Sequence, residues 1–266
     1  MKQICEDLRA EHEVLDDVVA NLTEERWMTM TPSVPWNIKD QIRHLAYFDD
    51  RAALSATAPD LFAKHIEEVM SDINGFVKTL DSVGKDMSIP DLMGWWRRER
   101  GKLIKAYLTI GPKDRLPWYG PPMSALSHAT ARLMETWAHG QDVFDALRIK
   151  RTNTDRLKHI AHLGVTTFGW SYTNRGLEVP KTRVRVELSA PSGTVWTWGP
   201  EDSTDRIAGP AEGFCLVVAQ RRHVDDTGLK IIGETARDWM LKGQCFAGPP
   251  TNGPKPGERV VEWENA

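Results

Sequence analysis

The segment TPSVPWNIKDQIRHLAYFDDRAAL, residues 31–54, decides the fold of the first part of the chain. From Ile38 onward, its apolar residues recur at the three- and four-residue spacing of an amphipathic helix. Asn37, with Asp40 three residues later, resembles a capping pair at the start of that helix. His44 follows one turn after Asp40. The Asp40 carboxylate therefore either orients the imidazole or only completes the cap, and the pattern favours the cap.

Helical spacing continues on both sides of this segment. Pro59, Pro90 and the pair Gly111–Pro112 interrupt it, and Gly176 ends it, because proline and glycine break helices. The loop WYGPPM, residues 118–123, is stiff and aromatic, and it could form the wall of a ligand site or serve only as a turn. Further helices are predicted over residues 4–22, 61–80, 91–110, 124–147 and 156–176.

The pattern changes after Pro180. Residues 182–189, TRVRVELS, alternate apolar and polar side chains as a half-buried strand does, and TVWTW (194–198) is a plausible hairpin partner. We predict an α+β chain: a helical bundle over residues 1–175, a small α+β domain over 176–250 and a mobile tail over 251–266. Within the second domain, helices are expected over 211–222 and 234–246, and a short strand over 229–233.

Composition excludes several classes of protein. The net charge of −3 gives no basic excess for nucleic-acid binding, and the basic stretch WWRRERGK (95–102) fits a solvated helix face with a buried tryptophan. No apolar run approaches the ~20 residues that span a bilayer, and the acidic N-terminus lacks the features of a signal peptide. Three widely spaced cysteines do not form a disulfide framework. We therefore expect a cytoplasmic protein without nucleic-acid or membrane partners.

Two pairs of residues, one Glu–His and one His–His, have spacings that allow chelation. Glu135 and His139 lie at i and i+4 on a predicted helix, so both side chains lie on one face, one turn apart. Taken alone, this spacing is also that of a solvated Glu–His pair, and a third ligand would have to come from elsewhere. His159 and His162 lie at i and i+3, but no carboxylate on their helix joins them.

Two of these segments together resemble the metal site of the DinB-like superfamily. Trp36, Asp40 and the run His44-Leu45-Ala46 resemble its second helix, in particular the branch that includes mycothiol-dependent maleylpyruvate isomerase. METWAHGQDVFDAL, residues 134–147, resembles the second signature of that branch, Glu-x-x-x-His with a following Asp, which here is Asp142. GPAEGFCLVVAQRR, residues 209–222, resembles a helix of the family's small sterol-carrier-like domain.

The resemblance implies a four-helix bundle in which His44, Glu135 and His139 bind one divalent metal. Zinc suits two imidazoles and one carboxylate, with nickel, iron and manganese as alternatives. The resemblance also implies a thiol cofactor, mycothiol or a similar small thiol, held by an arginine of the second domain. Arg221 is the nearest match, but the sequence VVAQRR leaves the choice between Arg221 and Arg222 open.

The implied function is a metal- and thiol-dependent transferase or isomerase that acts on a small electrophile. Two other functions fit the same residues. A hydrolase would use metal-bound water in place of the thiol, and a metal-stabilised bundle could bind a ligand without catalysis. The sequence identifies neither the substrate nor the oligomeric state.

Overall fold

The computed structural model describes residues 1–263 and divides the chain into two compact units. The first unit is Met1–Leu147, and the second begins at Arg148. No helix of the described residues is long and apolar enough to cross a membrane.

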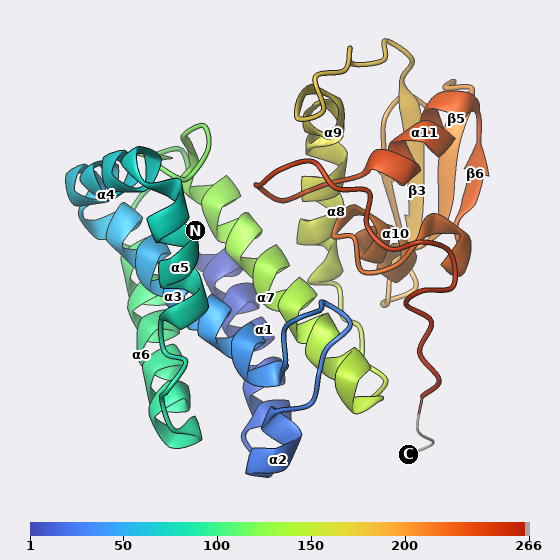
Figure 1. Ribbon diagram of the computed structural model, residues 1–266. Helices are drawn as coiled ribbons and strands as arrows, with labels where there is room; N and C mark the ends of the chain where they lie inside the picture. Colours follow the sequence, from blue (N-terminus) through green and yellow to red (C-terminus); the bar gives the residue numbers. More distant parts are fainter. Residues whose placement is uncertain (264–266) are drawn as a thin grey trace. The chain divides into compact units, whose positions relative to one another are not determined.

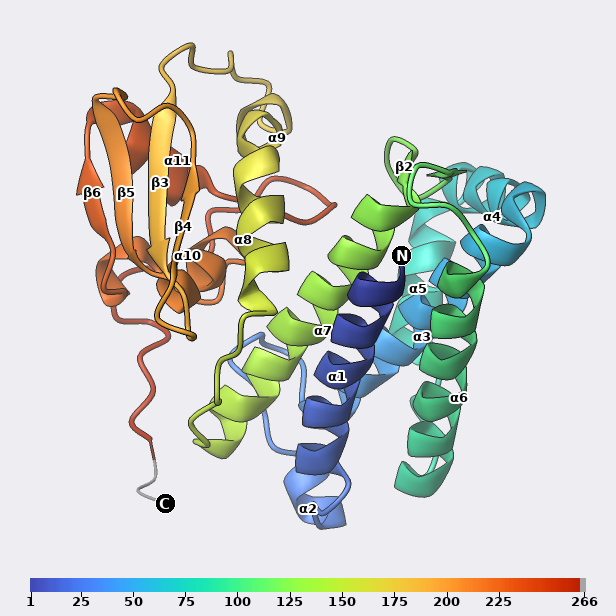
Figure 2. The same cartoon turned by 180° about the vertical axis from the view of Figure 1, so that it is seen from behind.

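Four long helices form the first unit, and Figures 1 and 2 show them from opposite sides. Helix α3 packs along α6 and α7, and α1 packs along α7 and α6, which confirms the predicted four-helix bundle. Short helices join the long ones. The bounds are α1 (Lys2–Val19), α2 (Glu24–Trp27), α3 (Ile38–Thr57), α4 (Pro59–Ser71), α5 (Ile73–Ser82), α6 (Ile89–Leu108) and α7 (Ala125–Leu147), with a two-stranded ribbon of β1 (Arg115–Leu116) and β2 (Met123–Ser124) before α7.

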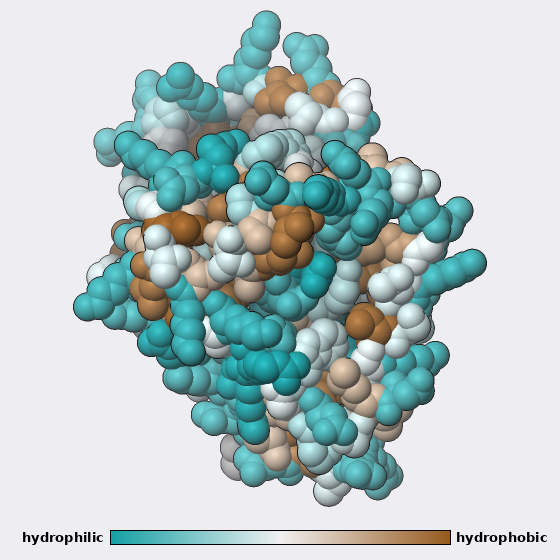
Figure 3. Space-filling view, turned by 90° about the vertical axis from the view of Figure 1, so that its left-hand side faces the viewer, coloured by the Kyte–Doolittle hydropathy of each residue, from teal (hydrophilic) through white to brown (hydrophobic). Residues whose placement is uncertain are grey.

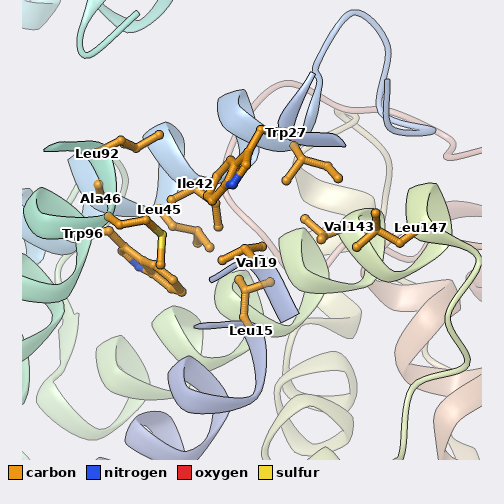
Figure 4. Packing of buried hydrophobic residues seen from close by; sticks show 12 residues of the cluster. Leu15, Val19, Trp27, Ile42, Leu45, Ala46, Leu92, Trp96, Val143 and Leu147 are labelled. Atoms are coloured by element: carbon orange, nitrogen blue, oxygen red, sulfur yellow. The ribbon is translucent and has the colours of Figure 1, made fainter. Parts of the chain in front are cut away.

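Apolar side chains from these helices fill the bundle (Figure 4). Trp27 and Trp96 are among the largest fully buried side chains. The basic stretch on α6 has a structural role, because Arg97 and Arg100 both bind the Asp16 carboxylate on α1. The guanidinium of Arg100 also lies 4.4 Å from the centre of the Trp96 ring. The predicted solvated face with a buried tryptophan is therefore present.

The segment predicted as one helix over 61–80 is two helices. Asp72, with φ −143°, breaks the chain direction, and its carboxylate accepts a hydrogen bond from the Gly75 backbone N–H at 2.8 Å. The aspartate thus caps α5 instead of continuing α4. Both helices are lightly packed: Phe62 is the one buried residue described for α4, and none is described for α5.

A four-stranded sheet in the order β4-β3-β5-β6 forms the second unit with α8 to α11. Strands β3 and β4 are the predicted antiparallel hairpin, with Leu188 opposite Trp196. The central strand β5 pairs parallel with β3 and was not predicted from the sequence, because its DRIAGP sequence contains glycine and proline, which are uncommon in strands. The bounds are α8 (Leu157–Thr166), α9 (Phe168–Thr173), β3 (Val184–Ser189), β4 (Val195–Trp198), β5 (Asp205–Pro210), α10 (Ala211–Val218), the 3₁₀ turn η1 (Val224–Asp226), β6 (Lys230–Ile232) and α11 (Glu234–Lys242).

The boundary between the units lies after Leu147, not near residue 175. Helix α8 packs on α10, and Gly164 allows this close approach. A Cβ atom at Gly164 would lie 2.8 Å from Val218 and 2.9 Å from Phe214. The predicted helix over 156–176 therefore belongs to the second unit, and it is interrupted at Thr167 between α8 and α9.

The predicted mobile tail lies partly outside the described residues. Residues 251–263 contain no helix or strand, and several of their groups form hydrogen bonds with the rest of the second unit. The backbone N–H of Thr251 donates to Gln244, and that of Gly257 donates to Asp226. The start of the segment is thus attached, and the mobility of the remainder stays a prediction.

Candidate metal centre

Three side chains from two helices of the first unit converge on one point. His44 lies two turns inside α3, whose start is fixed by a reciprocal capping box between Asn37 and Asp40. Glu135 and His139 lie one turn apart on α7. One ligand atom from each of the three lies within 4.8 Å of the others. Among residues 1–263, this is the one group of three or more histidine, cysteine or acidic side chains with such spacing.

The Glu135 carboxylate lies between the two imidazoles. Its Oε2 is 3.5 Å from Nε2 of His44 and 3.1 Å from Nε2 of His139. About a quarter of the Glu135 side chain and a fifth of the His44 side chain are exposed, whereas His139 is more deeply buried. The three side chains are thus largely enclosed by protein, and each keeps some exposed surface.

The environment favours the protonation states that bind metals. Burial lowers the pKa of His44 to about 4, so its imidazole is neutral at pH 7. Burial alone would raise the pKa of Glu135, but its contacts with His139 and His44 outweigh burial and hold the pKa well below the ordinary value. The carboxylate is therefore ionised. Neutral imidazole and ionised carboxylate are the ligand forms of these side chains.

A chain of buried hydrogen bonds fixes the tautomer of His139. The Thr31 hydroxyl donates to the backbone carbonyl of Trp36 at 2.7 Å, and a carbonyl can only accept. Thr31 Oγ1 must then accept from the Gln41 amide nitrogen at 2.8 Å. This orientation points Gln41 Oε1 at Nδ1 of His139, 2.6 Å away, so that nitrogen carries the hydrogen.

The lone pair of neutral His139 is consequently on Nε2, which faces Glu135. Nε2 and the Glu135 carboxylate are then two acceptors 3.1 Å apart, and they need a cation between them to be stable. Either a proton or a metal ion meets this need. The donor set, two imidazole nitrogens and one carboxylate, is that of catalytic zinc sites, so the residues present fit a divalent metal.

A buried ion network lies next to the ligands on the same helices. Arg132, one turn before Glu135, donates through Nη2 to Asp49 Oδ1 at 2.9 Å, and His12 Nε2 on α1 lies 3.4 Å from Asp49 Oδ2. Burial would raise the pKa of Asp49, but the Arg132 guanidinium and His12 lower it further than burial raises it. The network connects α1, α3 and α7 and so fixes the helices that carry the ligands.

Aromatic side chains surround the two histidines. The Trp36 ring stacks on His139 with centroids 5.8 Å apart and lies 5.1 Å from His44. Phe48, one turn after His44, is 4.6 Å from the His44 ring. The loop WYGPPM reaches the same place, because Tyr119 packs on Phe48 at 5.6 Å. The loop thus forms part of the surroundings of the candidate site.

Other residues singled out in the sequence have different positions. Asp40 caps α3 and binds Arg43, so the capping role is confirmed. Asp142 accepts a hydrogen bond from Ser33 at 2.8 Å, which attaches the loop carrying Trp36 to α7. His162 accepts a hydrogen bond from the Trp198 indole at 3.3 Å. It is not part of the group of possible metal ligands found among the described residues, which is His44, Glu135 and His139.

Arg221 and Arg222 lie beyond a helix, not at its end as predicted. Helix α10 ends at Val218, and Gln220 has a left-handed backbone with φ 56°. The backbone N–H of Arg221 donates to Leu216 at 2.7 Å, which closes the helix in a Schellman arrangement. Arg222 is buried and Arg221 is half-buried. Both belong to the second unit.

Four residues near the candidate site were not predicted from the sequence: Gln41, Thr31, Arg132 and Phe48. Phe48 and Arg132 had a usable signal, since they lie one turn from His44 and Glu135. Gln41 lies equally close to His44, but its contact with His139 could not be predicted, because that partner is 98 residues away and on another helix.

Comparisons with known proteins show the family and the fold of this chain. A family model described as mycothiol maleylpyruvate isomerase N-terminal domain matches residues 8–144, and a second model described as wyosine base formation matches residues 180–229. An uncharacterized protein of Mycobacterium tuberculosis, found in two strains, is 44% identical over 248 residues, which are 93% of this chain and 96% of the relative. The crystal structure of the mycothiol-dependent maleylpyruvate isomerase and that of a variant are each similar with a TM-score of 0.55 at 13% identity, covering 86% of this chain and 92% of that chain. The chain belongs to the mycothiol maleylpyruvate isomerase N-terminal domain family.

Proposed function

We propose that this member of the mycothiol maleylpyruvate isomerase family is a metal-dependent enzyme that uses mycothiol, or a similar small thiol, to transfer or isomerise a small electrophilic substrate. One observation carries the proposal: Nε2 of His44, Nε2 of His139 and the carboxylate of Glu135 lie close to one another, and the side chains of His44 and Glu135 are partly exposed. Family membership supports the thiol, since the relatives of known activity are named as mycothiol-dependent.

His44, Glu135 and His139 would hold the metal, with zinc as the proposed ion. Three protein ligands leave one position open on a tetrahedral ion, as in catalytic zinc sites. A bound divalent ion would lower the pKa of a coordinated thiol, so that the nucleophilic thiolate is present at neutral pH.

The chain's own residues prepare this site. Gln41 keeps the hydrogen of His139 on Nδ1, and Trp36 stacks on the His139 ring and restricts its rotation. Glu135 stays ionised and contributes the one negative charge of the ligand set. We propose that Arg221 or Arg222 binds the polar part of the thiol, because a guanidinium pairs well with oxygen acceptors.

Metal content tests the first part of the proposal. Protein saturated with zinc and then desalted should retain about one ion per chain, as expected for one three-ligand site. A His139→Ala variant should lose most of it, because two ligands chelate poorly. His162→Ala is the matched control, since this histidine lies outside the group, and it should retain the ion. Equal zinc in all three proteins would contradict the assignment.

Calorimetry across pH tests the thiol. Mycothiol should bind saturably to zinc-loaded protein and release a proton on binding, because the ion favours thiolate. Binding should be absent in the His139→Ala variant. If no cellular thiol binds, and instead a thiol-independent hydrolysis is found that disappears in Glu135→Ala, the protein is a hydrolase and the proposal is wrong.

A further inference from the structure

A continuous cluster of aromatic rings begins at the candidate metal site and extends under two lightly packed helices. Phe48 contacts the His44 ring, and its other neighbours are Tyr119 at 5.6 Å and Trp118 at 6.3 Å. Behind them, α4 and α5 supply three further rings. The aromatic cluster is defined as Phe48, Phe62, His65, Phe76, Trp118 and Tyr119.

Two ring pairs in this cluster are stacked face to face. Phe62 and Trp118 have centroids 5.5 Å apart and an interplanar angle of 3°, and Phe76 and Tyr119 are 5.5 Å apart at 25°. Except for Phe62, every member is only half-buried. Part of each of these half-buried side chains is thus exposed beside His44, and the rings already stack on one another as planar groups do.

The charged groups that act on His65 of the cluster include the Arg51 guanidinium and the Glu68 carboxylate. Arg51 donates to Asp50 through Nε at 3.0 Å, so its charge is already balanced. His65 accepts or donates at 2.9 Å with the Tyr119 hydroxyl, and burial, followed by the charge of Arg51, lowers the pKa of His65. At pH 7 the cluster therefore offers rings and a neutral hydroxyl–imidazole pair.

Helices α4 and α5 are held to the bundle through this cluster and, at the end of α5, through Arg43, which donates to the carbonyls of Leu80, Asp81 and Val83. Phe62 is the one buried residue described for the two helices, whereas Leu61, Met70, Ile73 and Val77 are exposed. Figure 3 shows the side of the molecule on which these helices lie, with hydrophobic side chains among hydrophilic ones. Elements with few buried contacts open at a low cost in free energy, so a planar ligand can enter beside Phe48.

We infer that the aromatic cluster binds the electrophilic substrate, and that this substrate is an uncharged, planar aromatic molecule with a conjugated carbonyl group. The inference rests on the proposed function, because it places the substrate next to the metal ligand His44. The ring of such a substrate stacks on Phe48 and Trp118, with its reactive carbon toward His44. In the reaction, the thiol sulfur bonds to the β-carbon, the carbon–carbon double bond becomes single, and the thiol proton ends on the α-carbon.

Binding is tested on zinc-free protein with ligands that cannot react. Cinnamyl alcohol is uncharged and planar, cinnamate has the same framework with a negative charge, and maleate has charge without a ring. By calorimetry, cinnamyl alcohol should bind saturably and at least about tenfold more tightly than either anion, since a buried anion without a free cation is costly. Tighter binding of cinnamate or maleate, or no binding of the alcohol, would overturn the inference.

Variants place the ligand on the cluster. Phe48→Ala and Trp118→Ala should each weaken binding of cinnamyl alcohol by about tenfold or more, because stacking and buried ring area are lost. Trp95→Ala is the matched control, since Trp95 is also half-buried but packs on the core of the bundle. If Phe48→Ala does not fold by circular dichroism, Phe48→Leu keeps apolar volume without the ring and makes the same test. Equal binding in cluster variants and control would overturn the inference.

Turnover separates this inference from the function on which it rests. Zinc-loaded protein with mycothiol should add the thiol to cinnamaldehyde faster than to maleate, and Phe48→Ala should raise KM more than it lowers kcat. If cinnamyl alcohol binds through Phe48 but no thiol addition occurs, the proposed function is wrong and the aromatic site stands. If thiol addition occurs with maleate preferred, the proposed function stands and the aromatic site is wrong.

Discussion

Among single residues, Gln41 keeps the hydrogen of His139 on Nδ1, so that Nε2, the candidate metal-binding nitrogen, is unprotonated. A neutral His139 can carry its hydrogen on either ring nitrogen. The backbone carbonyl of Trp36 sets the direction of the hydrogen bonds through Thr31 and Gln41, and this direction places the hydrogen on Nδ1. The direction of this chain follows from donor and acceptor chemistry alone.

Replacement of Gln41 should therefore weaken metal binding without removing a ligand. We expect Gln41→Leu to lower zinc affinity by about 10- to 100-fold, as loss of such partners does in other metal sites. Competition with a chromophoric chelator measures this. Gln141→Leu is the matched control, since Gln141 is equally buried but its amide donates to Asp145. An unchanged zinc affinity in Gln41→Leu would show that the hydrogen bonds from Trp36 to His139 have only a structural role.

His128 should make stability depend on pH. The Tyr107 hydroxyl lies 2.5 Å from His128 Nδ1, and burial, followed by the charge of Arg132, lowers the pKa of His128 to about 3. The unfolded chain takes up a proton near pH 6.5, but the folded chain does not until near pH 3. The unfolded state therefore binds more protons in this window, and stability falls as pH decreases.

Urea unfolding of metal-free protein between pH 6.5 and 4.5 tests this. Each such histidine should contribute a slope of up to roughly 1.4 kcal/mol per pH unit. His44, with its pKa of about 4, adds to the same window, whereas Glu135 and Asp49 titrate below it. His128→Gln should reduce the slope. A slope that is the same in the variant would mean that His128 is protonated in the fold.

The candidate site shows what single residues in a sequence can and cannot indicate. The i, i+4 spacing of Glu135 and His139 indicated a shared face, and the resemblance added His44. Partners contributed by distant helices, such as Gln41 to His139, depend on packing that no local pattern encodes.

At the scale of elements, strong helical periodicity predicted α1, α3, α6 and α7 to within a few residues. Errors occurred where one residue overrides the local pattern. Asp72 caps a new helix inside an apparently continuous one, and Thr167 separates α8 from α9. Strand β5 was not predicted, because it is stabilised inside the sheet by pairing with β3 and its own residues do not favour a strand.

Gly164 provides a test at this scale. A side chain there would collide with Val218 and Phe214, so α8 could not approach α10. Gly164→Val should destabilise the second unit by about 1–3 kcal/mol, the usual cost of overpacking. Calorimetric unfolding measures the change. Gly169→Val is the control, because a Cβ there meets only Val179, at 3.9 Å. Equal stability of the Gly164 variant and the native chain would contradict the packing described for α8.

At the scale of the whole molecule, the chain consists of two units with different roles. The first unit contains the candidate metal ligands and the aromatic cluster, and the family match over residues 8–144 lies within it. The second unit contains Arg221 and Arg222, for which we propose a role in thiol binding. The α+β class and the bundle were predictable from the sequence. The boundary between the two units was not, because it depends on the packing of α8 against α10 in the second unit.

Metal binding should stabilise the first unit specifically. A ligand that binds only the folded state adds about 2.7 kcal/mol at a hundredfold excess over its Kd. Zinc should therefore raise the Tm of one calorimetric transition, and Glu135→Gln, which removes the charged ligand, should abolish the shift. A shift that persists in Glu135→Gln would indicate binding elsewhere.

If His44, Glu135 and His139 share one metal ion, anomalous diffraction at the zinc edge from zinc-soaked crystals will locate it. We expect one strong anomalous peak bonded to Nε2 of His44, Nε2 of His139 and a Glu135 carboxylate oxygen, at distances of about 2.0–2.2 Å. A peak at other residues, or no peak among these three at saturating zinc, would show that the three side chains do not share an ion.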